Sequence, residues 1–214
     1  MKKTLGLTTA AALAAVTVGL LNGAQPQQKV SDEFRRQFIK DFPRIGLNTT
    51  TGDAAFLRVL VASAGCKRGV EVGSATGFGA INMGIAFERN GGQLVTLDID
   101  PKMIQATRDN IAKMGLAKTV TAIEGDAVKT LAELKGEFDF IFIDAHKPDY
   151  LKYLKTIEPK LKRGAIVVAD NVIRSEKQMR DYLDYVQTNP AYDTAIIQAS
   201  TEKKDGMAIS YKLR

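Results

Sequence analysis

The sequence predicts an α/β fold built on one mostly parallel sheet of seven strands, with helices on both faces. Short apolar runs alternate along the chain with segments in which apolar residues recur every three or four positions, as in helices packed on a core. Single helices between strands require that the strands run parallel. The last two apolar runs are joined only by a polar turn, which predicts an antiparallel hairpin at or near one edge of the sheet.

Length and composition set further limits. The chain has 214 residues, which suits one domain with a short appendage, and its 45% hydrophobic and 25% charged residues exclude extensive disorder. One cysteine, Cys66, and one histidine, His146, exclude a disulfide framework and a cysteine- or histidine-based metal centre, so any metal must take oxygen ligands. The net charge of +6 permits acidic partners. No Lys/Arg run exceeds two residues, however, and no basic stripe alternates with aromatics, so nucleic-acid binding is not favoured.

Residues 1–24 differ from the rest of the chain. Lys2 and Lys3 precede an uncharged apolar stretch over 5–21, and Ala24 stands before a polar segment. This pattern is typical of a signal peptide, and its length is also close to the lower limit for a membrane span. We therefore expect a signal-peptide-like or membrane-anchor leader over 1–24 and a single folded domain over 25–214.

The expected elements follow in the order that such a sheet requires. Apolar residues at helical spacing predict a first helix over 31–42, ended by Pro43, and a loop over 48–52 precedes a second helix with Asp53 as its N-cap. We then expect strands over 69–72, 93–97, 119–123, 138–143, 165–169, 194–199 and 207–211. The helices expected between the first five of these strands are 80–89, one that begins at Asp100 and Pro101 and stops at Gly115, one from Asp126 to about Leu134, and 150–161, which Gly164 ends. A last helix, opened by a Ser175–Gln178 capping box, is expected before the final two strands.

Ligands of such sheets bind beyond the carboxyl ends of the strands, and three strand ends carry unusual residues. The first is a turn over 71–79 with glycines at 73, 77 and 79, which allow a close backbone approach to a ligand. Its spacing, G-x-x-x-G-x-G, does not match the dinucleotide fingerprint G-x-G-x-x-G. No tyrosine is followed by lysine four positions later, as a short-chain dehydrogenase would need. A purely structural turn stays open as an alternative.

The second strand end carries Asp98, which follows the strand over 93–97. A carboxylate at this position can accept hydrogen bonds from both hydroxyls of a ribose. The alternative, a helix cap, is less favoured because Asp100 already fills that role.

The third feature is a pair of neighbouring strand ends. Asp144 follows one buried strand, and Asp170 and Asn171 follow the next. Two carboxylates and an amide oxygen form a site for a hard divalent cation such as Mg²⁺. Each acid alone could be a helix cap, but their paired occurrence favours the metal site.

Together these residues resemble the cation-dependent, S-adenosylmethionine-using O-methyltransferases, which include the catechol and caffeoyl-CoA O-methyltransferases. The similarity extends from about Thr49 to the C-terminus and is most specific over 70–79, 140–150 and 169–172, with Asp205-Gly206 resembling the family's ending. It implies a Rossmann-like methyltransferase domain that acts as an S-adenosylmethionine-dependent O-methyltransferase on a catechol-like small molecule. Relatives are frequently dimers, so the resemblance also implies a homodimer, to which helix 31–42 would contribute.

The resemblance also implies roles for individual residues. Lys147 matches the catalytic lysine, and Asp144, Asp170 and Asn171 match the metal ligands. The positions that match cofactor contacts are Thr51, Glu71, Gly73, Ser74, Gly79, Asp98, Ala127 and Asp144. His146 departs from the family pattern and could be a second base, an acceptor contact or a solvent-exposed residue.

The expected mechanism requires little covalent chemistry from the protein. The sulfonium methyl is already activated, so catalysis consists of in-line positioning and of forming an oxyanion on the acceptor. A divalent cation chelated by two vicinal oxygens acidifies the hydroxyl, and Lys147 can remove its proton if the neighbouring cation favours the neutral form of the lysine.

Two alternatives remain at this stage. Some relatives methylate a modified tRNA uridine, which the basic composition slightly favours and the leader disfavours. An exported or membrane-tethered binding protein without turnover would account for the leader. Localisation stays undecided, because the leader suggests export or anchoring whereas S-adenosylmethionine requires access to the cytosol.

Overall fold

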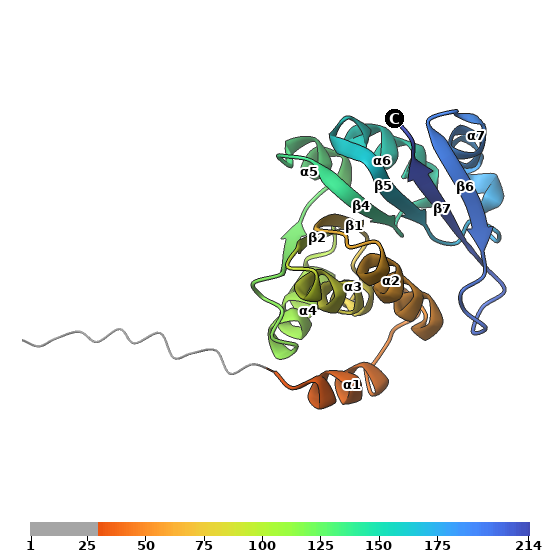
Figure 1. Ribbon diagram of the computed structural model, residues 1–214. Coiled ribbons are helices and arrows are strands. Elements are labelled where there is room, and N and C mark those ends of the chain that lie inside the picture. The colour runs from red at the N-terminus through yellow and green to blue at the C-terminus, as the bar shows by residue number, and fades with distance from the viewer. Residues whose placement is uncertain (1–29) are drawn as a thin grey trace, which may run out of the picture.

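The computed structural model describes residues 30–214, so the predicted leader over 1–24 lies outside the described residues. Within them, one seven-stranded sheet lies between two layers of helices (Figure 1). The strand order is β3-β2-β1-β4-β5-β7-β6. The first five strands pair in parallel, and β7 pairs antiparallel with both β5 and β6. The predicted fold class is confirmed, and the C-terminal hairpin forms one edge of the sheet.

The strands agree closely with the apolar runs of the sequence. Their bounds are β1 Arg68–Val72, β2 Gln93–Asp98, β3 Val120–Glu124, β4 Phe138–Ile143, β5 Leu161–Ala169, β6 Tyr192–Ile197 and β7 Met207–Lys212. Both faces of β4 are covered: Ile141 and Ile143 pack among the helices of one layer, whereas Phe140 and Phe142 pack among the helices of the other. A continuous apolar run is what burial on both faces requires.

The helices divide between the two faces. Their bounds are α1 Asp32–Lys40, α2 Thr51–Ser63, α3 Phe78–Arg89, α4 Pro101–Lys113, α5 Ala127–Glu133, α6 Tyr150–Ile157 and α7 Arg180–Thr188, with single 3₁₀ turns η1 Lys147–Asp149, η2 Glu158–Lys160 and η3 Glu176–Gln178. Helices α2, α3 and α4 cover one face, α5, α6 and α7 cover the other, and α1 lies outside the first layer (Figure 1). The predicted dimer contact through α1 stays a prediction, although its Phe34 is 47% exposed.

Three local predictions were wrong in detail. The N-cap of α2 is Thr50 rather than Asp53, because the Thr50 Oγ1 accepts the Asp53 N–H at 3.2 Å and donates to the Asp53 carboxylate at 2.7 Å. This reciprocal pair resembles a capping box, so Asp53 belongs to the first turn and not to the cap.

The other two errors concern β5 and α7. Helix α6 ends at Ile157 because Pro159 cannot donate a helical hydrogen bond, and β5 begins at Leu161. Gly164, with φ +84°, therefore lies inside β5, beside a register shift, and does not end the helix. The Ser175 side chain makes no capping bond, and α7 begins only at Arg180.

None of the helices within 30–214 is both long enough and apolar enough to serve as a membrane span.

Candidate active site

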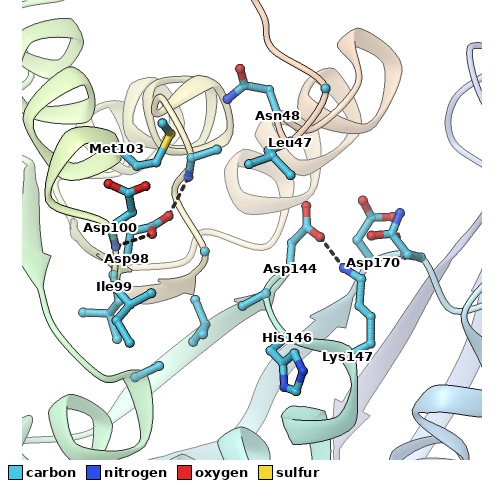
Figure 2. Close-up of a pocket in the computed structure, with 18 of the residues that line it drawn as sticks. Leu47, Asn48, Asp98, Ile99, Asp100, Met103, Asp144, His146, Lys147 and Asp170 are labelled. Carbon is cyan, nitrogen blue, oxygen red and sulfur yellow. Dashed lines mark hydrogen bonds and ion pairs between the residues drawn. The ribbon is translucent and has the colours of Figure 1, made fainter.

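A cavity of about 900 Å³ opens at the carboxyl ends of β1 to β5, where the strand-end residues were predicted to meet (Figure 2). The predicted site residues that line it are Gly73, Asp98, Ala127, Asp144, Lys147, Asp170 and Asn171. The structure therefore brings the predicted sugar-binding acid and the predicted metal ligands to one cavity, as the rule for open parallel sheets requires.

The glycine turn lies directly against the neighbouring strand ends. The N–H groups of Gly73 and Ser74 both donate to the Leu97 carbonyl, at 2.8 and 3.1 Å. Gly73 has φ +96°, and a Cβ at this position would lie 2.1 Å from the Asp144 carbonyl oxygen. Only glycine fits such an approach, so the turn has a demonstrable structural requirement as well as its predicted ligand role.

Asp98 fixes this turn while facing the cavity. Its Oδ2 accepts the N–H groups of Ser74 and Ala75 at 3.1 and 2.9 Å, and its Oδ1 accepts the Asp100 N–H at 3.0 Å. Asp100 caps α4 as predicted, with its side chain bonded to the Lys102 N–H. A carboxylate offers about four acceptor positions, so Asp98 retains capacity for a hydroxyl of a bound ligand.

Four predicted cofactor residues do not line the cavity: Thr51, Glu71, Ser74 and Gly79. Glu71 is buried below the turn, where it accepts a hydrogen bond from the Thr96 hydroxyl, and burial raises its pKa to about 8. Gly79 packs on this carboxylate, since a Cβ there would lie 2.5 Å from Glu71 Oε1.

The other two predicted residues serve neighbouring loops. The Ser74 hydroxyl is buried and lies 3.2 Å from the Thr107 hydroxyl. Thr51 begins α2 and donates its N–H to Glu202, whereas Thr50 takes the position at the cavity wall. Their predicted contacts with a cofactor stay predictions.

The two predicted metal-binding carboxylates stand side by side. Ile143 and Ala169 are paired in the β4–β5 register, so the next residues, Asp144 and Asp170, leave the sheet at the same level (Figure 2). Burial, followed by the negative charge of Asp144, raises the pKa of Asp170 to about 7. Bringing two carboxylates together at low exposure is unfavourable unless cations accompany them.

Lys147 is one such cation. Its Nζ lies 2.9 Å from Asp144 Oδ1 and 2.9 Å from the Tyr150 hydroxyl oxygen. Tyr150 is fully buried and donates in turn to the Asp170 carbonyl at 3.2 Å. The ammonium group is therefore held at the floor of the cavity, between the two acids (Figure 2).

Asn171 presents its amide with a defined orientation. The residue has φ +62°, a left-handed conformation that asparagine tolerates better than most residues. Its Nδ2 donates to Asp205 Oδ2 at 3.2 Å, and its Oδ1 accepts no hydrogen bond within residues 30–214. Two carboxylates and a free amide oxygen on one cavity wall form a hard-oxygen donor set that fits Mg²⁺ or a similar cation.

His146 lies at the outer margin of the cavity. Its side chain is 69% exposed, its Nδ1 lies 3.0 Å from Asp149 Oδ2, and the ring projects away from Asp144 and Asp170 (Figure 2). This position disfavours a second base, and the alternatives of an acceptor contact and a solvent-exposed residue remain.

Sequence reasoning missed the residues that cover the cavity from above. A roof loop over 44–48 carries the exposed apolar side chains of Ile45 and Leu47, and Arg44 in this loop pairs with Glu202 at 2.7 Å. Glu202 and Lys203 belong to the polar turn between β6 and β7, which the sequence indicates only as a hairpin connection. No local pattern reveals a contact between segments so distant along the chain.

The strand order, the antiparallel β7 and the acidic residue Asp98 at the end of β2 define the class of Rossmann-like methyltransferases. The chain belongs to the O-methyltransferase family, whose model matches residues 23–212. It is an S-adenosylmethionine-dependent O-methyltransferase of the type that includes the catechol and caffeoyl-CoA enzymes, as its sequence resemblance implied.

Individual comparisons agree with this assignment. The chain is 33% identical over 185 residues to a catechol O-methyltransferase of Niastella koreensis, an alignment that covers 78% of this chain and 82% of the relative. It is 27% identical over 173 residues to caffeoyl-CoA O-methyltransferase 1 of Zea mays, an alignment that covers 75% of this chain and 67% of the relative. The crystal structure of cofactor-bound Rv0187 from MTB superimposes with a TM-score of 0.74 at 27% identity, covering 90% of this chain and 92% of that one.

Proposed function

We propose that the protein transfers a methyl group from S-adenosylmethionine to one hydroxyl of a catechol-like small molecule in a reaction that depends on a divalent cation. The observation that carries this proposal is the meeting of Asp144, Asp170 and Asn171 with Lys147 on one cavity that Asp98 also lines. The names of the catechol and caffeoyl-CoA relatives support the acceptor class.

The cofactor side of the cavity is formed by the ends of β1, β2 and β3. Asp98 accepts the ribose hydroxyls, the backbone of Gly73 lies along the amino-acid part, and Ala127 packs on the adenine. Glu71, Ser74 and Gly79 hold this wall from behind, where Glu71 is fully buried. Thr51 contacts the cofactor from the start of α2, where its N–H donates to Glu202 in the turn between β6 and β7.

The metal side is formed by the ends of β4 and β5. Asp144, Asp170 and Asn171 would hold a divalent cation, which, when bound, supplies Lewis acidity to two vicinal oxygens of the acceptor. Asp205 keeps the amide oxygen of Asn171 directed into the site by accepting its Nδ2.

Lys147, as the neutral amine left after its ammonium group has released a proton to solvent, takes the proton of the reacting hydroxyl. Its Nζ is fixed by Asp144 and the Tyr150 hydroxyl, both at 2.9 Å, so the ammonium group cannot swing freely toward solvent. General-base assistance of this kind typically contributes a factor of about 10² to 10⁴. The remaining rate enhancement comes from orienting acceptor and donor in line.

The roof determines which acceptors fit. The apolar side chains of Ile45 and Leu47 stand over a polar floor that carries the acids, an arrangement that suits a flat aromatic ring with hydroxyls on one edge. RNA is disfavoured because the cavity wall carries many carboxylates, among them Asp98, Asp126 and Asp149.

A methyl-transfer assay with chelated enzyme tests the proposal. We expect turnover of a catechol after Mg²⁺ is restored, little turnover of a phenol with one hydroxyl, and none of either in the presence of chelator. Turnover that persists with chelator would contradict the metal dependence. Preferred methylation of tRNA, with steep salt dependence, would contradict the small-molecule acceptor.

A further inference from the structure

Lys203 reaches from the turn between β6 and β7 to one of the predicted metal ligands. Its Nζ lies 2.7 Å from Asp170 Oδ2 and 3.2 Å from Asp53 Oδ2. The side chains of Asp53 and Asp170 are 3% and 1% exposed, and that of Lys203 is 17% exposed. One ammonium group therefore joins two buried carboxylates from separate parts of the chain.

This ammonium group balances the charge of the two carboxylates, because its Nζ lies within ion-pair distance of both. Buried carboxylates without a counter-charge are strongly destabilising, so the lysine neutralises the site when no other cation does so.

The contacts of Asp170 place a positive charge where a divalent cation would bind. Its Oδ1 accepts the Asn171 N–H at 2.7 Å, and its Oδ2 accepts Lys203. Both oxygens are thus engaged within the protein, and a divalent ion beside Oδ2 would meet a positive charge at close range. Like charges at such a distance repel strongly away from bulk water.

From this geometry, and resting on the metal dependence proposed above, we propose that Lys203 is an internal counter-cation of the site, whose ammonium group competes with a divalent cation for Asp170. Binding of the cation displaces Lys203 from Asp170. The neighbouring Glu202 holds Arg44 of the roof loop and the N–H of Thr51, so the same turn links the metal ligands to the roof of the cavity.

Calorimetric titration of the metal-free, full-length protein with Mg²⁺ tests the competition without any turnover. Lys203→Met removes the charge and keeps the chain length, Lys203→Arg keeps the charge, and Lys204→Met is the matched control because Lys204 is exposed. We expect Mg²⁺ affinity to rise about tenfold or more in Lys203→Met and to stay close to wild type in the other two.

A second measurement needs no substitution and decides the matter if Lys203→Met fails to fold. Lysine acetylation of the wild-type protein, followed residue by residue by mass spectrometry, reports how accessible each Nζ is. We expect Mg²⁺ to increase acetylation of Lys203 and to leave that of Lys204 unchanged.

The outcomes separate this inference from the proposed function. Mg²⁺ binding that is equal or weaker in Lys203→Met, with unchanged acetylation of Lys203, overturns the competition and leaves metal-dependent catalysis standing. Binding to Lys203→Met but not to wild type supports the competition and overturns metal dependence of the natural protein. Absence of binding in every variant overturns both.

Discussion

The side-chain amide of Asn171 donates to the carboxylate of Asp205 at 3.2 Å, which connects a predicted metal ligand to the final hairpin. The other oxygen of Asp205 accepts the backbone N–H groups of Ile173, Arg174 and Gly206. One buried acid thus fixes both the backbone after β5 and the direction of the Asn171 amide. The Asp-Gly ending that supported the family resemblance acquires a physical role at the site.

Asp205→Asn should disturb stability and metal affinity together. Asparagine can keep one oxygen on the three backbone donors, but its amino group then faces the amino group of Asn171, which must turn its own amino group into the site. We expect a loss of about 1–3 kcal/mol in the free energy of unfolding by urea, together with weaker Mg²⁺ binding by calorimetry. Asp193→Asn, at an exposed position of β6, is the control.

The pH dependence of this variant has a definite sign. Burial alone would raise the pKa of Asp205, but hydrogen bonds from Arg174, Gly206, Asn171 and Ile173 outweigh it and lower the pKa below its usual value. The carboxylate therefore adds stability above its unfolded pKa of about 3.9, and this contribution disappears as the pH falls through the lower folded pKa. A stability difference between wild type and variant that does not shrink as the pH falls below about 3.9 would contradict this account.

The site residues that the sequence predicts follow from a local pattern, whereas those that it misses depend on contacts between distant segments. Asp98, Asp144 and Asp170 could be predicted because each directly follows an apolar strand, and parallel strands bring such ends together. The cap of α2 was misassigned because Thr50 and Asp53 are both good capping residues, and the reciprocal bond between them decides the outcome.

Lys203 could not be predicted at all. It joins Asp53 and Asp170 only after β7 has been inserted beside β5, and nothing in the turn itself distinguishes it from its exposed neighbour Lys204. The same holds for the pairing of Arg44 with Glu202, which brings together two segments from opposite ends of the domain.

Glu71→Gln should remove a large pH dependence of stability. Burial raises the pKa of Glu71 from its usual 4.5 to about 8, so the folded protein keeps a proton that the unfolded chain has already lost. The contribution of protonated Glu71 to the free energy of unfolding is complete below about pH 4.5. It is lost as the pH rises to about 8, at up to roughly 1.4 kcal/mol per pH unit. Glutamine does not titrate, so the variant should become more stable relative to wild type as the pH rises across this window.

Urea unfolding at several pH values between about 5 and 8.5 measures the effect. Glu137→Gln, at an exposed position before β4, should follow the wild-type curve throughout. Parallel stability curves for wild type and Glu71→Gln would show that Glu71 is ionised in the folded protein and would contradict the prediction.

Lys147→Ala should abolish most turnover and leave cofactor affinity nearly intact. The lysine is bonded to Asp144 and Tyr150 at the floor of the cavity, and within residues 30–214 it makes no hydrogen bond to the glycine turn. We expect kcat to fall by about 10² to 10⁴, with S-adenosylhomocysteine binding by calorimetry within a few-fold of wild type. Lys152→Ala, on the exposed side of α6, controls for the loss of a positive charge. Unchanged kcat would remove Lys147 from the mechanism.

Asp98→Asn should produce the opposite pattern, because Asp98 acts on the cofactor side of the cavity. Its carboxylate holds the N–H groups of Ser74 and Ala75 and, by the proposed function, the ribose hydroxyls. The amide loses the charge and turns one acceptor into a donor, so S-adenosylhomocysteine should bind roughly 10- to 100-fold more weakly, whereas Mg²⁺ affinity should not change. Asp109→Asn, on the exposed face of α4, is the control. If Asp98→Asn weakened Mg²⁺ and the cofactor equally, general damage to the sheet edge would explain the loss better than a missing contact with the ribose.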